Sequence, residues 1–247
     1  MKFIGIIPAR YSSSRLPGKP LAMIGDKPMI QHVYERASEA LTEVWVATDD
    51  QRIMDAVEAF GGKAVMTSAE HRTGTDRCAE VAMRMAAVGD VIVNIQGDMP
   101  FITPESIILL CGCFNDPSTE IATLAAPFGA AEDILVPHKV KVLVENDGWA
   151  YNFSRVPIVK DLNTHGSQEE WLASNYKHIG IYGYRYETLL QITKLPQSPS
   201  ELAESLEQLR WLANGYRIKC AIIPEETISV DTPDDLLKAN QFLAGVR

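Results

Sequence analysis

The chain has few of the features that mark membrane, secreted or nucleic-acid-binding proteins. Its apolar runs fall well short of the roughly 20 residues that a transmembrane helix needs. Its start lacks a basic stretch followed by a signal-type apolar core. Lysine and arginine number 23 against 32 acidic residues, and this formal net charge of −9 argues against nucleic acid or an anionic membrane as the main partner. We therefore expect a cytoplasmic protein that is not exported.

Cysteine is scarce as well, and the usual nucleotide-binding fingerprints are missing. The four cysteines are Cys78, Cys111, Cys113 and Cys220, and no Cys/His set has zinc-site spacing. Cys111 and Cys113 are two apart in an apolar helix-like run, where both cannot point the same way. We expect reduced, buried thiols. The sequence has neither a Walker A motif nor a G-x-G-x-x-G fingerprint, which excludes the common P-loop and dinucleotide-binding folds.

Apolar strand-like runs alternate with helical periodicity through the first half of the chain. The predicted strands are residues 2–8, 44–48, 63–66 and 91–95, and the predicted helices are 28–40, 50–60 and 75–87. This βαβα order predicts an α/β fold of Rossmann-like type, with a mostly parallel sheet flanked by helices. In such sheets ligands bind beyond the carboxyl ends of the strands.

From about residue 121 the pattern changes. Strand-like runs at 121–127, 139–145, 178–184 and 217–223 are separated by loops of irregular length, which predicts a mixed β region. Residues 160–170 are polar and are expected to form a mobile loop. With no repeat or linker evident, we expect one domain over 1–247, with a nucleotide-binding half at 1–120 and the mixed β region at 121–247.

The loop after the first predicted strand gathers positive charge. Arg10, Arg15 and Lys19 lie within ten residues that contain no acid. A cationic loop at a strand's carboxyl end is suited to phosphate, because guanidinium groups bind it bidentately and a lysine adds a mobile charge. An ordinary solvated loop is the alternative. We favour the phosphate site, given the acidic background of the rest of the chain.

Two aspartates stand at predicted strand-to-helix junctions, 133 residues apart. Asp98 follows a strand that should be buried, where a carboxylate is costly unless it is paired or binds a cation. Asp231 precedes a strong helix start in which Thr232 is the N-cap and Pro233 the first residue. Thr103 is likewise a better cap than Asp98 for the helix that follows it. The two aspartates are thus free to meet at one Mg²⁺.

Several segments in this order resemble one family. They are the opening loop (residues 7–20), His71-Arg72-Thr73-Gly74-Thr75-Asp76-Arg77, Asn94-Ile95-Gln96-Gly97-Asp98, Phe153-Ser154-Arg155, residues 178–184, residues 206–210 and Val230-Asp231-Thr232-Pro233. Over essentially the whole chain, the sequence is similar to cytidylyltransferases that activate 3-deoxy-manno-octulosonate (Kdo), the acidic sugar of lipopolysaccharide inner cores.

The resemblance implies a nucleotidyltransferase that makes a CMP-sugar and pyrophosphate from CTP and an acidic octulosonate, with Mg²⁺ as cofactor and a homodimer as the assembly. A sugar hydroxyl would attack the α-phosphorus in line, without a covalent enzyme intermediate. The catalytic residues implied are Arg10, Arg15, Lys19, Asp98 and Asp231, of which the two aspartates hold the metal.

The resemblance also implies binding residues. Those for the nucleotide are Ala9, Arg10, Ser13, Lys19, Thr75 and Arg77. Those for the sugar are Gln96, Arg155, His178, Tyr182 and Glu207. Without the resemblance, Arg77 would be interpreted as a surface residue in a helix's first turn, His178 as a core histidine, and Glu207 as a helix acid paired with Arg210. Arg155 suits a carboxylate, and His178 and Tyr182 share one face of a predicted strand.

Three positions depart from the family pattern, and they cluster near the sugar-side motifs. Met99 replaces the usual acid after Gln-Gly-Asp, Val156 follows Phe-Ser-Arg where a small or hydroxyl residue is common, and Ser229 replaces a glycine. The acceptor could therefore be Kdo or its 8-amino-3,8-dideoxy analogue.

Other functions stay open from sequence. A different CTP-dependent enzyme, such as one making CMP-sialic acid or cytidylyl-methylerythritol, would share the opening loop. A glycosyltransferase would need a metal-binding Asp-x-Asp, and Thr48-Asp49-Asp50 is better interpreted as a helix start. A non-catalytic nucleotide-binding module would not need both metal aspartates.

Overall fold

A computed structural model describes residues 1–13, 15–129, 133–159, 171–172 and 174–245. The chain forms two compact units. The first contains Met1–Ile108, Tyr184–Thr193 and Thr227–Arg247, and the second contains Leu109–Gly183 and Lys194–Glu226. The number of domains stays a prediction. The polar loop expected at 160–170 lies outside the described residues.

The first unit contains a parallel sheet whose strands run in the order β6-β1-β4-β5. The strands are β1 (Phe3–Ala9), β4 (Val44–Thr48), β5 (Ala64–Met66) and β6 (Val91–Asn94). The helices between them are α1 (Met29–Ala40), α2 (Gln51–Ala59) and α3 (Gly74–Met85). The predicted βαβα order is confirmed, with boundaries shifted by one or two residues.

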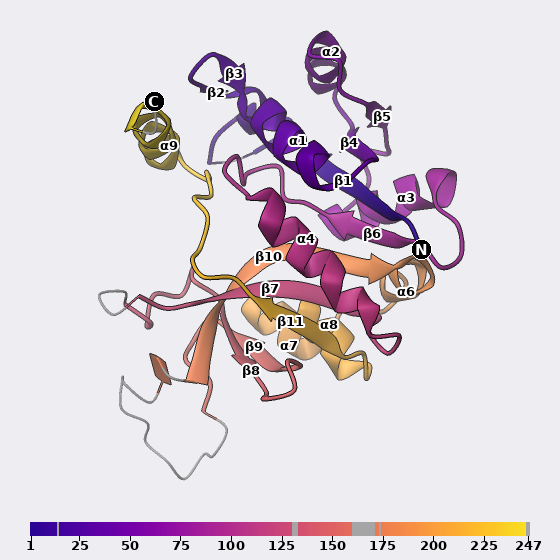
Figure 1. Cartoon of the computed structure of the whole chain (residues 1–247), viewed down its shortest axis with the longest axis vertical. Coiled ribbons are helices and arrows are strands. Elements are labelled where there is room, and N and C mark those ends of the chain that lie inside the picture. Colours follow the sequence, from indigo (N-terminus) through magenta and orange to yellow (C-terminus); the bar gives the residue numbers. More distant parts are fainter. Residues whose placement is uncertain (14, 130–132, 160–170, 173, 246–247) are drawn as a thin grey trace. The chain divides into compact units, whose positions relative to one another are not determined.

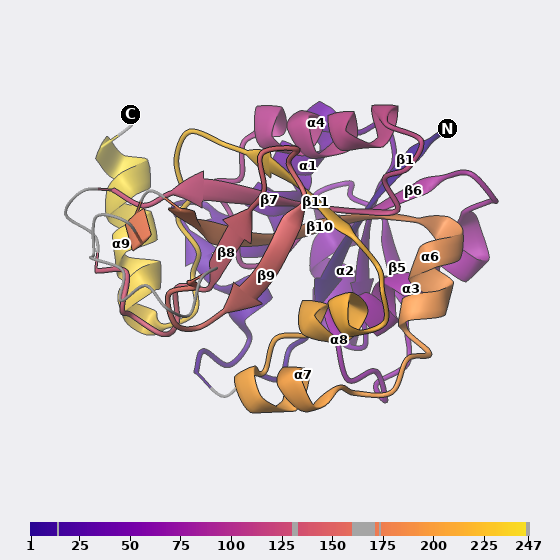
Figure 2. The same ribbon diagram turned by 90° about the horizontal axis from the view of Figure 1, so that it is seen from below.

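Helices cover both faces of this sheet. Helix α1 connects β1 to its neighbour β4. Helix α3 connects β5 to β6, and this connection passes β4 and β1 in the opposite direction. Right-handed crossovers in opposite directions place α1 and α3 on opposite faces, as Figures 1 and 2 show. Ile4, Ile6 and Ile7 of β1 are accordingly buried, and so is every residue of β6. The α/β, Rossmann-like prediction is confirmed.

Side-chain caps fix where the helices begin. Asp50 accepts a hydrogen bond from the Arg52 backbone N–H at 3.0 Å and starts α2. Thr73 and Asp76 form a reciprocal capping box at α3. The predicted cap at Thr103 is confirmed, because its hydroxyl accepts from the Ser106 N–H at 3.2 Å at the start of α4 (Pro104–Gly112). Each cap satisfies N–H groups that a helix start leaves without partners.

The end of the chain returns to the first unit. The last helix, α9 (Pro233–Gly245), begins with the predicted cap Thr232, whose hydroxyl accepts from the Asp235 N–H at 3.2 Å. It packs beside the small hairpin of β2 (Met23–Ile24) and β3 (Lys27–Pro28) (Figure 1). Ile24, Val230 and Ala239 share one buried apolar cluster there. Helix α6 (Tyr186–Ile192) also belongs to this unit.

The second unit holds the mixed β region. Its strands are β7 (Ile121–Pro127), β8 (Lys141–Val144), β9 (Ala150–Ser154), β11 (Ile218–Ile222) and β10 (Asn175–Arg185), which crosses into the first unit at Tyr184. Strand β7 pairs with β11 in parallel, and β8 pairs with β10 and β9 in antiparallel fashion (Figure 2). The mixed sheet is therefore confirmed. Strand β9 was not predicted, because its exposed Tyr151 and polar Asn152 dilute the apolar alternation.

The described part of this unit also contains two short α-helices. They are α7 (Pro199–Glu204) and α8 (Gln208–Ala213). Cys78, Cys111 and Cys220 are buried free thiols, as expected. Cys113 is also free but only half-buried, since the two side chains of the Cys111–Cys113 pair cannot point the same way. Burial raises the pKa of Cys111 to about 12.

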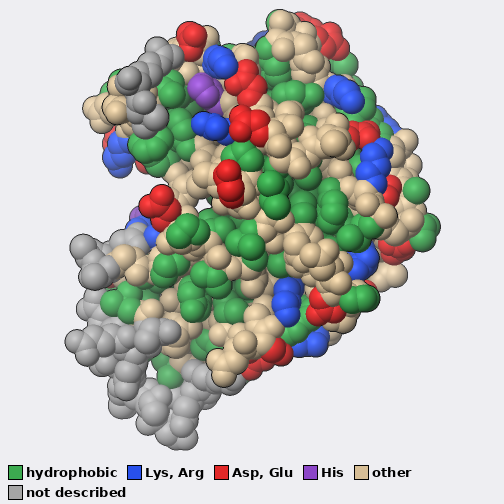
Figure 3. All heavy atoms as spheres, viewed as in Figure 1, with side chains coloured by type: hydrophobic (Ala, Val, Ile, Leu, Met, Phe, Trp, Pro, Cys, Tyr) green, Lys and Arg blue, Asp and Glu red, His purple; other side chains and the backbone are tan. Residues whose placement is uncertain are grey.

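The surface agrees with the acidic composition. On the face drawn in Figure 3, acidic and basic side chains are interspersed and do not form one broad basic field. None of the helices in the described ranges has both the length and the apolar character that crossing a bilayer requires.

Candidate functional site

Lys19, Asp98 and Asp231 meet in the first unit. The Lys19 ammonium donates to Asp98 Oδ2 at 2.8 Å and to Asp231 Oδ1 at 3.0 Å. Both carboxylates therefore lie at hydrogen-bond distance from one cation, although they are far apart in sequence. The predicted convergence of the two aspartates is present in the structure. We call these three side chains the carboxylate–lysine cluster.

Backbone contacts explain how the cluster forms. The Val230 N–H donates to the Asp98 carbonyl at 2.9 Å, which places Asp231 beside the turn that follows β6. Val230 is fully buried and anchors this segment in the apolar cluster beneath it. Gly97 lies so close to β1 that a Cβ would stand 3.2 Å from the Pro8 carbonyl oxygen. A larger residue at 97 would push the Asp98 turn away from the sheet.

The opening loop carries Lys19 to these carboxylates. Gly18 has a left-handed conformation (φ 67°) and donates its N–H to the Tyr11 carbonyl at 3.0 Å, so the loop folds back on itself. The Arg52 guanidinium stacks 3.3 Å above the Tyr11 ring and pins the start of the loop. Ser13 Oγ accepts from the Leu16 N–H at 3.4 Å. Hydrogen bonds within the loop and the contact with Arg52 of α2 thus hold the described part of the loop.

Arg15 extends the cluster toward solvent. Its guanidinium donates to Asp231 Oδ1 at 3.0 Å, and its side chain is 64% exposed. The Lys19 side chain is only 17% exposed. Burial lowers the pKa of Lys19, but the adjacent Asp98 and Asp231 carboxylates outweigh this and raise its pKa overall. Lys19 is therefore the more buried cation and contacts both carboxylates, whereas Arg15 is the more exposed one and contacts only Asp231.

Arg10 lies at the start of α3 and not in the carboxylate–lysine cluster. It follows Ala9, the last residue of β1, and donates to the carbonyls of His71 and Thr73. Burial and then the neighbouring Arg77 lower the pKa of Arg10. The Arg10 guanidinium and the N-terminus of α3 together make this end of β1 attractive to an anion. Thr75, in the first turn of α3, is also buried here.

Arg77 corrects one interpretation made from the sequence. Arg77 is 0% exposed, so its interpretation as a surface residue in the first turn of the helix is wrong. The guanidinium donates to Asp49 Oδ2 at 2.7 Å and to the Thr67 hydroxyl. A buried guanidinium needs such a carboxylate, since an unpaired charge in the interior is very costly. Arg77 ties α3 to the segment after β4.

The carboxylate pair suits a divalent cation. Among the described residues, no group of three or more His, Cys, Asp or Glu side chains could hold a metal ion. Mg²⁺ does not require one, because it usually takes one or two carboxylates and completes its shell with water and substrate phosphates. The Lys19 ammonium already lies between the Asp98 and Asp231 carboxylates, so the two negative charges bind a cation there.

The second unit brings His178 and Tyr182 together. They are on β10 with ring centroids 5.3 Å apart, as their shared strand face predicts. His178 also packs against Phe153 at 5.0 Å, and its Nε2 lies 3.0 Å from the Thr123 hydroxyl. That hydroxyl has one proton and faces the carbonyls of Ile179 and Ile181, so it accepts from the imidazole N–H. Burial lowers the pKa of His178 to about 3 and keeps the ring neutral.

Arg155 is fixed by the end of α7. Its Nε donates to the Glu204 carbonyl at 2.6 Å, and its two terminal nitrogens donate to the carbonyls of Pro137 and Ser205 at 3.2 and 3.4 Å. The Glu204 carboxylate accepts from the Arg155 backbone N–H. A guanidinium has five N–H groups, so three neutral carbonyls leave donors and the full charge for another partner.

Glu207 and Gln96 have local partners. Arg210 donates to Glu207 Oε1 at 2.7 Å, which is the i, i+3 pair that the sequence offered as the structural alternative. Gln96 belongs to the first unit, where its side-chain amide donates to Asn94 Oδ1 at 3.4 Å. The roles of these two residues toward a sugar stay predictions.

The positions that depart from the family pattern differ in burial. Met99 is 6% exposed, so an apolar side chain suits its place, where a carboxylate would pay a desolvation cost. Val156 is 61% exposed and Ser229 is exposed as well. Nothing in the structure explains the residue types at these two positions.

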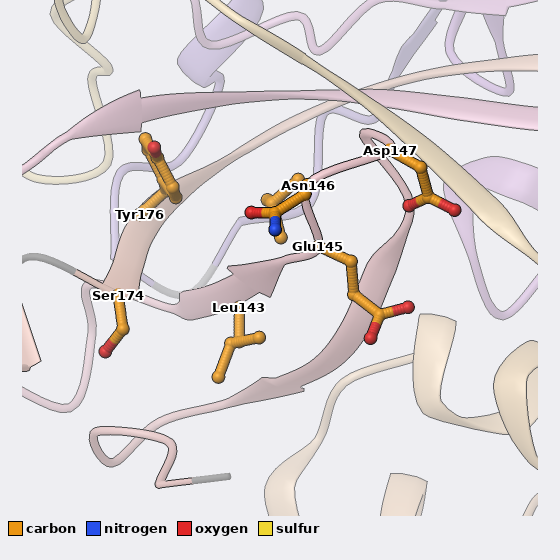
Figure 4. A pocket seen from close by; sticks show the side chains of 7 residues that line it. Leu143, Glu145, Asn146, Asp147, Ser174 and Tyr176 are labelled. Carbon is orange, nitrogen blue, oxygen red and sulfur yellow. The ribbon is translucent and has the colours of Figure 1, made fainter.

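A pocket in the second unit is not part of the predicted site. It has a volume of about 590 Å³ and lies at the turn that joins β8 to β9, beside the first part of β10 (Figure 4). Its lining residues are Leu143, Val144, Glu145, Asn146, Asp147, Ser174 and Tyr176. None of the residues predicted to bind nucleotide, sugar or metal is among them.

Sequence reasoning missed the partners that hold several site residues. These are Asp49 for Arg77, Glu204 for Arg155 and Thr123 for His178, at separations of 28, 49 and 55 residues. Asp49 was considered only as part of a helix start. No local pattern could have indicated any of the three, because each contact depends on how distant segments pack.

Comparison with known proteins identifies the family that the chain resembles. The sequence profile of a family described as cytidylyltransferase matches residues 4–219. A 3-deoxy-manno-octulosonate cytidylyltransferase of Parabacteroides distasonis is 54% identical over 252 aligned positions that cover 99% of each chain. One of Geobacter metallireducens is 47% identical and covers 99% of this chain and 98% of its own.

Solved structures agree in fold. A CMP:2-keto-3-deoxy-manno-octonic acid synthetase complexed with CTP is 45% identical, covers 100% of both chains and gives a TM-score of 0.91. A glucose-1-phosphate thymidylyltransferase described as putative, from Bacillus anthracis, is 18% identical with a TM-score of 0.69, and it covers 97% of this chain and 94% of its own. The second likeness concerns the fold alone.

Proposed function

The chain belongs to the cytidylyltransferase family, and from this premise we propose that it transfers the cytidylyl group of CTP to 3-deoxy-manno-octulosonate and releases pyrophosphate. The relatives with 47–54% identity over nearly the whole chain carry that activity in their names. The observation in this chain that best supports the proposal is the carboxylate–lysine cluster beside a cationic loop. It combines a place for a divalent cation with positive charges for a triphosphate.

In the proposed reaction, a sugar hydroxyl attacks the α-phosphorus of CTP in line. The bond from this phosphorus to the bridging oxygen breaks, the pyrophosphate takes its electron pair, and the hydroxyl proton passes to solvent. Negative charge grows on the leaving phosphates and on the α-phosphate oxygens. Arg10, Arg15 and Lys19 stabilise this charge, so catalysis is positional and electrostatic.

Asp98 and Asp231 would hold Mg²⁺. When bound, the ion would neutralise phosphate charge and lower the pKa of a hydroxyl near it. A hydroxyl acidified in this way would lose its proton to water, so no histidine base is needed. The neutral His178, whose pKa is far below its ordinary value, fits this assignment better than a role as base.

The remaining residues divide between the two substrates. Ala9, Ser13, Thr75 and Arg77 contribute to the nucleotide site at the end of β1, Ala9 through its backbone and Arg77 by fixing α3. On the sugar side, Arg155 binds the carboxylate with the donors that its backbone partners leave over.

The other sugar residues offer uncharged and charged hydrogen-bonding groups. His178, Tyr182 and Gln96 can bind hydroxyls, and Glu207 can accept from one. The buried Met99 keeps the 8-amino-3,8-dideoxy sugar as a candidate acceptor beside Kdo. We further propose that the protein is a homodimer and acts in the cytoplasm.

The deciding experiment is a pyrophosphate-release assay with CTP, Mg²⁺ and a panel of acidic sugars. We expect release with an octulosonate, none with sialic acid, and none when UTP, ATP or GTP replaces CTP. Turnover with sialic acid instead would favour the related CMP-sialic acid synthetase activity. If no sugar gives pyrophosphate release although CTP still binds, the protein is better explained as a nucleotide-binding module, and the proposal is overturned.

A further inference from the structure

Lys19 is the shared partner of both carboxylates proposed to hold the metal. Its ammonium is within 3.0 Å of an oxygen from each aspartate. Two carboxylates this close to one point repel each other unless a cation lies between them. The Lys19 ammonium therefore compensates the charge of the two carboxylates, as a bound metal cation would. Its charge is an integral part of the site.

The backbone that carries Lys19 is held in place. Lys19 begins the short 3-10 helix η1 (Lys19–Leu21), between the left-handed Gly18 and Pro20. Its N–H donates to the Leu16 carbonyl at 3.1 Å, and its own carbonyl accepts from the Ala22 N–H at 3.1 Å. These hydrogen bonds hold the backbone of Lys19, and the ammonium can change partner by rotation of its four-carbon stem.

Charge balance determines what a metal ion must do on entering. Arg15 and Lys19 carry two positive charges against the two negative charges of Asp98 and Asp231. A divalent cation at the carboxylates would leave both basic side chains with no counter-charge. A triphosphate removes that imbalance, because it brings several negative charges of its own. The metal alone is disfavoured here, and metal with nucleotide is favoured.

We propose that Lys19 is the resident cation of the carboxylate pair, that the metal ion displaces it, and that it then moves onto the triphosphate, so that metal and nucleotide bind cooperatively. This inference rests on the proposed function, since it concerns the same metal and nucleotide. It assigns Lys19 a second task before chemistry starts. By linkage, the nucleotide raises the affinity for the metal as much as the metal raises the affinity for the nucleotide.

A simple phosphate-binding role predicts a different outcome. If Lys19 only bound phosphate, removing its charge would weaken CTP binding and leave the affinity for a free metal ion unchanged. If Lys19 held the two aspartates in place structurally, its removal would weaken metal binding. Removal of a resident cation makes metal binding tighter, and by more than removal of a charge that contacts only one of the two carboxylates.

The test measures Mn²⁺ binding to the whole protein by electron paramagnetic resonance of the free ion, without nucleotide. We expect Lys19→Met and Lys19→Gln to bind Mn²⁺ about tenfold more tightly than the natural protein. Arg15→Met should give a smaller gain, because Arg15 contacts only Asp231 and is largely exposed. Lys27→Met is the matched control, since it removes one positive charge at the separate Lys27–Glu35 pair and should leave the affinity unchanged.

A second titration measures the coupling itself. Addition of α,β-methylene CTP, which cannot react, should raise the Mn²⁺ affinity of the natural protein severalfold and that of Lys19→Met much less. Circular dichroism checks that each variant is folded. Unchanged or weaker Mn²⁺ binding by both folded Lys19 variants would overturn the inference.

The two proposals fail separately. If the Lys19 variants bind Mn²⁺ more tightly but the natural protein releases no pyrophosphate, the role of Lys19 as resident cation is supported and the proposed function is wrong. Normal release with unchanged Mn²⁺ binding would do the reverse.

Discussion

The guanidinium of Arg77, wholly shielded from solvent, donates to the Asp49 carboxylate at 2.7 Å. The pair links the first turn of α3 to the segment between β4 and α2. It therefore fixes the helix whose N-terminus lies beside Arg10. The contact therefore stabilises the carboxyl edge of the sheet and holds the helix next to the proposed nucleotide site.

Breaking this pair should destabilise the fold. We expect Arg77→Met to lower the free energy of unfolding by about 3 kcal/mol, because it leaves Asp49 without its cation. Asp49→Asn should also destabilise, and the double variant should lose less than the sum of the two. Urea unfolding of all four proteins gives these values. Additive losses would show that the two side chains do not act as a pair.

The two aspartates should matter for turnover far more than for folding. Asp98→Asn and Asp231→Asn should each lower kcat about 100-fold or more in the pyrophosphate assay, since each removes charge that would hold the metal. The matched control is Glu39→Gln, an exposed acid of α1 that pairs only loosely with Arg36 at 3.7 Å. Full activity in either aspartate variant would contradict the assignment of these residues.

The left-handed Gly18 offers a clean comparison with Gly61. Both have positive φ, 67° and 80°, but a Cβ on Gly18 would meet the Tyr11 ring at 3.2 Å, whereas one on Gly61 would meet nothing within 4 Å. We expect Gly61→Ala to cost about 1 kcal/mol of stability with unchanged kinetics. Gly18→Ala should cost more and raise the KM for CTP severalfold, because it shifts the loop that carries Lys19. Equal kinetics for the two variants would contradict this account of the loop.

Stability should fall at acid pH because of His178. Its pKa is lowered from 6.5 to about 3 in the folded protein, so between these values the unfolded chain binds a proton that the folded chain does not. This contribution to stability is present above pH 6.5 and is lost as the pH falls toward 3. His178→Gln, which keeps a donor for Thr123 but does not titrate, should flatten the pH dependence of urea unfolding. The same change at the exposed His138 serves as the matched control. If His178→Gln shows the same pH dependence of unfolding free energy as the natural protein, the prediction is wrong.

The acceptor can be tested by direct competition. With Kdo and its 8-amino-3,8-dideoxy analogue at equal concentration, we expect unequal kcat/KM, because the sugar-side departures Met99 and Val156 change size and charge relative to the family pattern. Quantifying the two CMP-sugars by mass spectrometry gives the ratio. Met99→Glu should change that ratio, whereas Ile108→Glu, at an exposed apolar position of α4, should not. Equal kcat/KM for the two sugars would remove any reason to connect these positions with specificity.

The amino-acid sequence by itself determined the local and periodic features. The alternation of apolar runs and amphipathic stretches defined the βαβα order, since burial on both faces of a parallel strand requires a continuous apolar run. Capping at Asp50, Thr103 and Thr232 followed from side chains that satisfy nearby backbone N–H groups. The opening loop was recognisable because its charges are adjacent in the chain.

Only the tertiary structure decided which distant side chains share a partner. Lys19 reaches Asp98 across 79 residues and Asp231 across 212, and Arg77 turns inward to Asp49 instead of facing solvent. These contacts depend on strand order and on the return of the C-terminal segment beside β6, which no local pattern encodes. Water and salt weaken the attraction between distant charges, so the packing of the apolar segments that carry these charges sets which of them pair.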